Sequence, residues 1–177
     1  RIAHLSDLHL LPKGTLNFWH LFGRRAFGAA NLLMLRRHVH SEPVARAAVQ
    51  TVLDANVDYC VVTGDVCNLA LDSEFALALD VLAPLRDNQQ LTVIPGNHDY
   101  YTPESARHDR FGHWFGHTEY PMFKDIGDVR IIGLRSSTFV PPLCAYGRLG
   151  PEQLQALARL IDVANQEHRF PIVALHH

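Results

Sequence analysis

Short apolar runs alternate along this chain with longer segments whose apolar residues recur at helical spacing. We expect each short run to form a buried strand and each longer segment to form a helix. The predicted strands cover Arg1 to Ser6, Tyr59 to Thr63, Leu91 to Ile94, Val129 to Leu134 and Pro171 to Leu175. The predicted helices run from Ser41 to about Ala55, from Phe75 to Leu85 behind a cap at Asp72 or Ser73, and from Glu152 to about Asn165 with Pro151 in the first turn. This alternation predicts an α/β fold whose parallel strands are joined by helical crossovers.

Two segments interrupt this alternation. Residues 10–41 are far longer than the usual connection between a strand and a helix, and they hold many aromatic and arginine residues with no acid before Glu42. We favour a helical cap packed on the domain; the alternatives are a lid, or a basic amphipathic surface at 13–41 for an anionic or lipid-like substrate. Residues 100–121, rich in histidine and aromatic residues, are either a surface helix and turn or the wall of a pocket.

Composition narrows the classes of protein. A length of 177 residues suits a single domain covering 1–177, and a net charge of −2 argues against a nucleic-acid coat. The cysteines are Cys60, Cys67 and Cys144, which form no CxxC pair and fit a reducing compartment. No apolar run reaches the length of a membrane span. We therefore expect a cytoplasmic protein, with peripheral membrane contact through 13–41 as the alternative.

Polar side chains follow the predicted strands. Asp7-Leu8-His9 follows the first strand, Gly64-Asp65 the second, Gly96-Asn97-His98-Asp99 the third and His176-His177 the last. Carboxyl ends of parallel strands meet at one edge of a sheet, so these side chains are expected to converge. Residues two apart on an extended chain point the same way, which predicts that Asp7 and His9 face one point, whereas His4 packs on the other side.

The donor types point to a metal site. Burying Asp7 beside Asp65 is costly unless cations compensate the two charges. The donors are carboxylate, imidazole and amide oxygens without thiolate, a mixture that suits Mn, Fe, Zn or Co. We therefore expect a pair of divalent or trivalent metal ions, with Mn, Fe or Zn favoured.

Taken together, the motifs Asp7-x-His9, Gly64-Asp65-x-x-Asn68, Gly96-Asn97-His98-Asp99 and the apolar run into His176-His177 resemble the calcineurin-like metallophosphoesterases. The resemblance implies a four-layer αββα fold, a β-sheet sandwich with helices on its outer faces. It also implies a binuclear metal centre. Asp7 and His9 would hold one metal, Asp65 would bridge both, and Asn97 and His176 would hold the second. His98 would protonate or stabilise the leaving oxygen, with Asn68 or Asp99 orienting it.

One motif of the family is missing. Its later Gly-His-x-His segment, whose histidines complete both metal spheres, does not occur before His177, and His168 does not match it. We expect the C-terminal part of the domain to lie beyond His177.

The implied reaction is in-line attack on phosphorus by a hydroxide that bridges the metals. The positive charge of two divalent ions exceeds the negative charge of Asp7, Asp65 and hydroxide by one unit. A singly charged phosphodiester would therefore leave the site neutral. We therefore expect hydrolysis of a small phosphodiester, either a cyclic nucleotide or a linear diester. The alternatives are a phosphomonoesterase, a nuclease, a hydrolase of lipid-linked phosphodiesters, or a non-catalytic scaffold. Nucleic acid is the less favoured partner, because the stretch from Lys13 to Arg46 is the one candidate for a basic track and the remainder of the chain is acidic.

Overall fold

The computed structural model describes residues 1–12, 42–139 and 146–177, and these residues form two three-stranded sheets. The expectations for a cap, a lid or a basic surface at 13–41 lie outside the described residues. The first sheet, in the order β1-β2-β3, contains β1 (Ile2–Ser6), β2 (Tyr59–Thr63) and β3 (Leu91–Ile94), all parallel. The second, in the order β4-β5-β6, contains β4 (Met122–Ile126), β5 (Val129–Gly133) and β6 (Phe170–Ala174). Strand β5 pairs antiparallel with β4 and parallel with β6.

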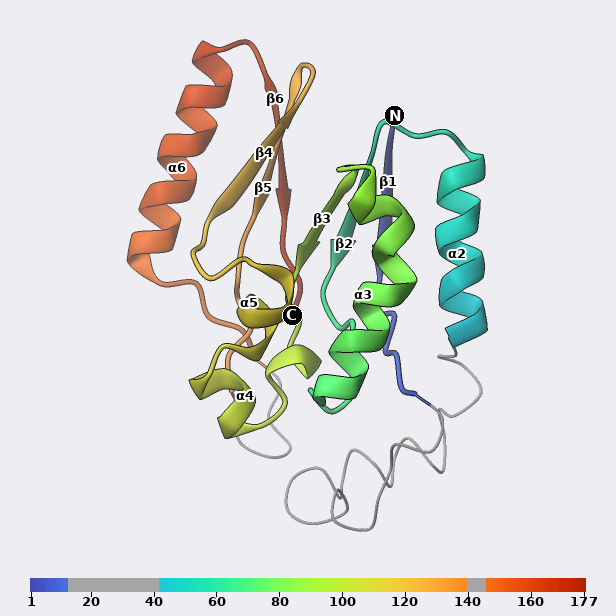
Figure 1. The fold of residues 1–177 in the computed structure, drawn as a ribbon. Coiled ribbons are helices and arrows are strands. Elements are labelled where there is room, and N and C mark those ends of the chain that lie inside the picture. Colours follow the sequence, from blue (N-terminus) through green and yellow to red (C-terminus); the bar gives the residue numbers. More distant parts are fainter. Residues whose placement is uncertain (13–41, 140–145) are drawn as a thin grey trace.

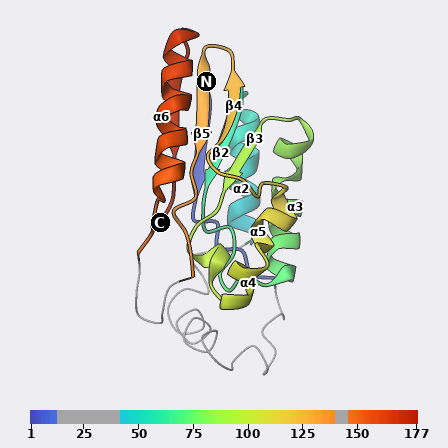
Figure 2. The same ribbon diagram turned by 90° about the vertical axis from the view of Figure 1, so that its left-hand side faces the viewer.

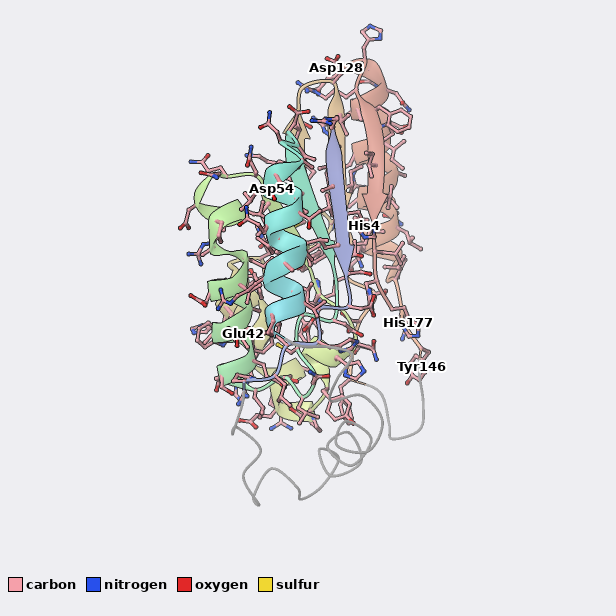
Figure 3. All side chains as sticks on the ribbon, turned by 90° about the vertical axis from the view of Figure 1, so that its right-hand side faces the viewer. His4, Glu42, Asp54, Asp128, Tyr146 and His177 are labelled. Atoms are coloured by element: carbon pink, nitrogen blue, oxygen red, sulfur yellow. The ribbon has the colours of Figure 1, made fainter. Side chains whose placement is uncertain are left out.

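Helices cover the outer faces of the two sheets. They are α2 (Glu42–Asp54), α3 (Asp72–Asp87) and α6 (Pro151–Gln166). The short helices η3 (His98–Tyr100, a 3-10 helix), α4 (Pro103–Arg107) and α5 (Arg110–Phe115) follow β3 in the chain. Figures 1 and 2 show α6 outside the second sheet, and α2 and α3 outside the first. Figure 3 shows α2, between its labelled ends Glu42 and Asp54, standing beside β1. The four-layer αββα sandwich is confirmed, and no described helix is long and apolar enough to cross a membrane.

Strand β2 lies at the centre of the sandwich, and all of its residues are buried. Alternate side chains serve the two interfaces, as the pleat of a strand requires. Cys60 and Val62 pack with α2 and α3, whereas Tyr59 and Val61 pack with residues of the second sheet such as Ile131. Because β2 is covered on both faces, its end is fixed from both sides, and Asp65 follows two residues later.

The structure corrects three expectations about the elements. Strands β5 and β6 belong to a second sheet, so the prediction of one parallel sheet was wrong. Strand β4, which forms a hairpin with β5 through Gly127 at φ +55°, was not predicted. Helix α3 begins at Asp72 behind Leu71, so neither Asp72 nor Ser73 is its N-cap.

The largest apolar cluster centres on Phe75 of α3, which is fully buried and lies 6.4 Å and 6.5 Å from the ring centroids of Trp114 and Phe115. We expect Phe75→Ala to lower the free energy of unfolding by about 3–5 kcal/mol, because it leaves a cavity in a closely packed interior. Urea denaturation measures this change. Phe170→Ala, at a side chain that is 68% exposed, is the control and should change stability by less than about 0.5 kcal/mol. Similar losses in both variants would contradict this account of the core.

Candidate metal centre

The carboxyl ends of β1, β2, β3 and β6 lie at the same end of the molecule, which is also where the chain ends in Figure 1. Three of them continue into the turns that carry Asp7 and His9, Asp65, and His98. The fourth, β6, brings His176 across from the second sheet. The expected convergence is therefore present, but it involves two sheets.

The backbone at the site is strained. Asp7, His9 and Asp65 all have positive φ, at 56°, 45° and 52°, a region that costs a residue with a Cβ about 1–2 kcal/mol. The two turns hold one another through hydrogen bonds from His9 N to the Asp65 carbonyl (2.9 Å) and from Asp7 N to the Gly64 carbonyl (3.3 Å). Asp7 and His9 do face one point, but through these left-handed turns and not through the extended chain that we expected. Strain of this kind persists where the surroundings over-determine the geometry, as they do at functional sites.

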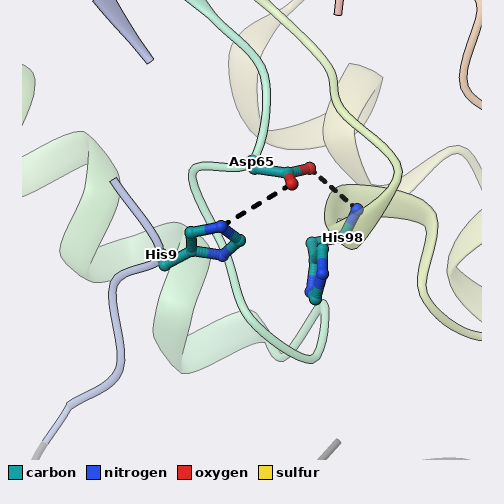
Figure 4. Close-up of side chains that lie close together, drawn as sticks. All are labelled: His9, Asp65 and His98. Atoms are coloured by element: carbon teal, nitrogen blue, oxygen red, sulfur yellow. Dashed lines mark hydrogen bonds and ion pairs between the residues drawn. The ribbon is translucent and has the colours of Figure 1, made fainter. Parts of the chain in front are cut away.

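Asp65 is the centre of the cluster. Its buried carboxylate accepts a hydrogen bond from His98 N at 2.9 Å, and its Oδ2 lies 3.7 Å from His9 Nε2, as Figure 4 shows. The same Oδ2 lies 3.4 Å from His176 Nε2, and His9 Nε2 lies 3.7 Å from Asp7 Oδ1. One carboxylate is thus shared among donors that come from three other segments.

The spacing of these donors suits metal ions. Nitrogen and oxygen ligands held at about 2.0–2.2 Å from one ion lie about 3–4 Å from each other. Two groups of donors meet this condition, each with its atoms within 4.8 Å of one another: His9, Asp65 and His98, and Asp7, Asp65 and His176. Asp65 belongs to both groups, which is the placement that a bridging ligand needs. Asp7 also lies within 3.7 Å of His9, so the expected pairing of Asp7 and His9 on one metal stays a prediction.

Asn97 is half-buried and immediately precedes η3. No described residue forms a hydrogen bond with its side chain, so its amide oxygen is available to a ligand. Its neighbours on either side, Gly96 and His98, both lie against Asp65. The expected role of Asn97 as a metal ligand stays a prediction.

The His98 ring is held by a main-chain group. Its Nδ1 lies 2.8 Å from the carbonyl oxygen of Asn68, and a carbonyl only accepts, so Nδ1 carries a proton. The side chain of Asn68 instead donates to the carbonyl of His9. The ring of Tyr101, which the sequence analysis did not single out, stacks on His98 at a centroid distance of 5.4 Å. Asn68 thus orients His98, although through its backbone.

Asp99 is fully buried and has a different task from the expected one. Its two oxygens accept hydrogen bonds from Gly96 N (2.8 Å) and Cys67 N (3.0 Å), so it ties the turn after β3 to the turn after β2. Burial, together with the charge of Asp65, raises the pKa of the Asp99 carboxyl to about 7. In the described part of the chain Asn68, and not Asp99, provides the hydrogen bond to the His98 ring.

Asp65 and His176 form an ion pair. Burial acts to raise the pKa of the Asp65 carboxyl, but the hydrogen bond with His176 and the charge of His98 hold that pKa below its ordinary value. The same hydrogen bond raises the pKa of the His176 imidazole against the opposing effect of burial. The protein itself therefore favours the ionised Asp65 carboxylate that a metal requires, whereas His176 would have to lose its proton to bind the metal.

Two glycines make room for these ligands. A Cβ on Gly64, which has φ +66°, would lie 2.6 Å from the His176 Cβ. A Cβ on Gly96 would overlap Asp65 Oδ1 and lie 2.8 Å from His176 Cδ2. The sequence contains both glycines within its motifs, but their function as space for ligands from another strand is visible only in three dimensions.

Comparisons with known proteins agree with this geometry. A family model described as calcineurin-like phosphoesterase matches residues 1–177, and the chain belongs to that family. A comparison with curated protein sequences found no match to the chain. A dimetal phosphatase from Danio rerio has a similar crystal structure, with a TM-score of 0.51 and 16% identity over 98% of this chain and 68% of that chain. At this identity the likeness shows the fold.

The family and the donor cluster define a metal-dependent phosphoester hydrolase. The resemblance drawn from the motifs is therefore confirmed. Two divalent metal ions are implied by the family, and the carboxylate and imidazole donors around Asp65 fit them.

Gly96→Ala tests whether the tight turn positions the ligands. We expect the dissociation constant for Mn²⁺ to rise at least about tenfold, because the added methyl group displaces Asp65 or His176. Isothermal titration calorimetry measures it. Gly150→Ala is the matched control, since a Cβ there meets no atom within 4 Å and its φ is −72°. Unchanged affinity in Gly96→Ala would show that the ligands lie elsewhere.

Proposed function

We propose that this chain hydrolyses a small phosphodiester at the donor cluster around Asp65. The observation that carries the proposal is that Asp65 belongs to both groups of metal-compatible donors, with His98, itself in one group, fixed by the Asn68 carbonyl. Asp7, His9, Asp65, Asn97 and His176 are the residues that would hold the metals. When bound, two divalent ions supply a water of lowered pKa and neutralise charge on the phosphate.

His98 is the proposed general acid. Its Nδ1–H is committed to the Asn68 carbonyl, so the transferable proton of the imidazolium is on Nε2. Stacking on Tyr101 and the edge-on contact with His9, at a centroid distance of 4.8 Å, restrict the ring to one orientation. A ring held in this way can deliver its proton to the departing alkoxide oxygen without reorganisation.

Charge supports a diester over a monoester. The ligand set contains two carboxylates, Asp7 and Asp65, and neutral imidazole and amide groups besides. Two divalent ions with hydroxide and these carboxylates leave a single positive charge, which a phosphodiester cancels and a doubly charged monoester exceeds. Among the metals, Mn, Fe and Zn suit this mixed nitrogen and oxygen set.

Hydrolysis of bis-p-nitrophenyl phosphate with Mn²⁺, compared with p-nitrophenyl phosphate, tests the substrate class. We expect the diester to have the higher kcat/KM, measured by release of p-nitrophenolate. A clear preference for the monoester would replace the proposal with a phosphomonoesterase.

His98→Ala tests the general acid. We expect kcat for the diester to fall by about 10²–10⁴, the usual contribution of a proton donor, while the Mn²⁺ content stays the same. Kinetics and elemental analysis measure the two quantities. His108→Ala, at an exposed histidine of the neighbouring helix end, is the matched control. Loss of metal in His98→Ala would instead identify His98 as a ligand, as its place in one donor group allows.

A further inference from the structure

A cavity of about 570 Å³ opens between the segment that follows β5 and the beginning of α6. The residues that line it include Arg135 and Arg148 and the hydroxyl-bearing Ser137 and Thr138. Small-molecule sites commonly measure about 300–1,000 Å³, so the cavity has room for part of an organic substrate. None of these residues belongs to the donor cluster around Asp65.

Hydrogen bonds connect one wall of the cavity to the turns of the candidate metal centre. Ser137 Oγ donates to the carbonyl of Pro95 at 3.5 Å, and Ser136 Oγ donates to the carbonyl of His176 at 2.5 Å. The amide of Arg148 donates to the carbonyl of Ser136 at 2.8 Å. One wall of the cavity is therefore attached to the two turns that deliver metal-binding side chains from β3 and β6.

Arg135 is pre-organised. Gln153 of α6 binds both its amide (2.9 Å) and its carbonyl (3.0 Å). The guanidinium lies 5.7 Å and 5.5 Å from the ring centroids of Tyr100 and Tyr120. Asp109 Oδ2, at 3.6 Å, offsets part of its charge, and the side chain remains 37% exposed. An arginine held in this way loses little conformational freedom when it binds an anion.

Two further side chains at the cavity lack an ionic or hydrogen-bond partner for their polar group among the described residues. Arg148 is exposed and forms no ion pair with any residue that the structure describes. The hydroxyl of Tyr120, whose ring lines the cavity, is buried without a hydrogen-bond partner among the described residues. Among the described residues that line the cavity Glu152 is the one acid, which leaves the two arginines in excess there.

We propose that this cavity binds a second phosphate group of the substrate, so that the preferred substrate is a phosphodiester that carries a further phosphate. Planar guanidinium groups bind phosphate through paired hydrogen bonds, and the neighbouring metal centre would receive the diester. The inference rests on the proposed phosphodiesterase function of the same site, which it deepens.

The test compares two chromogenic substrates with the Mn²⁺-loaded protein. They are the p-nitrophenyl ester of thymidine 5′-phosphate and the same ester with an additional 3′-phosphate. We expect the 3′-phosphate to raise kcat/KM about tenfold, as charge-assisted hydrogen bonds do, and Arg148→Gln to abolish this advantage. Arg159→Gln, at an exposed arginine farther along α6, is the matched control and should keep it.

A binding measurement separates the subsite from the reaction. Calorimetry with thymidine 3′,5′-bisphosphate and thymidine 5′-phosphate requires no turnover, and we expect the bisphosphate to bind about tenfold more tightly in a manner that depends on Arg148. Tighter binding of the bisphosphate that depends on Arg148 supports the subsite even if no diester is hydrolysed. Absence of diester hydrolysis would overturn only the proposed function. Equal kcat/KM for the two esters and equal binding of the two nucleotides would overturn the subsite and leave diester hydrolysis standing.

Discussion

The burial of the Asp65 carboxylate is the constraint on which the rest of the site depends. A charged group in this position is costly unless hydrogen bonds and positive charge surround it. The protein supplies the amide of His98 and the imidazole of His176, and it leaves the carboxylate within reach of two groups of donors. The two metal ions that the family implies would need a ligand of this kind, since one carboxylate would have to serve both cations.

Asp99 fixes the turns on either side of this carboxylate relative to one another. It is deeper than Asp65 and binds two backbone amides, one on each of the turns that follow β2 and β3. The turns are thereby fixed relative to one another before any ligand arrives. Gly64 and Gly96 complete the arrangement, because they allow His176 to approach from the other sheet. The precision of the centre thus depends on groups that would bind neither metal nor substrate.

Much of this could be predicted from the sequence, for identifiable reasons. Strand β2 is buried on both faces, so it reads as an uninterrupted apolar run and was predicted with its observed ends. Strand β4 is an edge strand whose Phe123, Lys124 and Asp125 include exposed and charged side chains, and such a strand has no apolar run to reveal it. The donor residues were recognisable because their chemistry resides in side chains.

Main-chain contributions escaped prediction. Nothing in the residue type of Asn68 indicates that its carbonyl, and not its amide, meets His98. The positive φ of Asp7 and His9 is likewise set by the neighbouring turn through hydrogen bonds between backbones. The resemblance implied two sheets, but the apolar pattern did not place β5 and β6 in the second one, because that placement depends on contacts distant in sequence.

That division has a thermodynamic consequence. His176 extends from β6, whereas Asp65 follows β2, so any cation shared by them is a cross-link between the two halves of the sandwich. A ligand that binds only the folded state stabilises it by mass action. Here the stabilisation would act on the contact between the two sheets. Loading with metal would therefore strengthen the coupling between the two sheets, and their separation would require release of an ion bound by both residues.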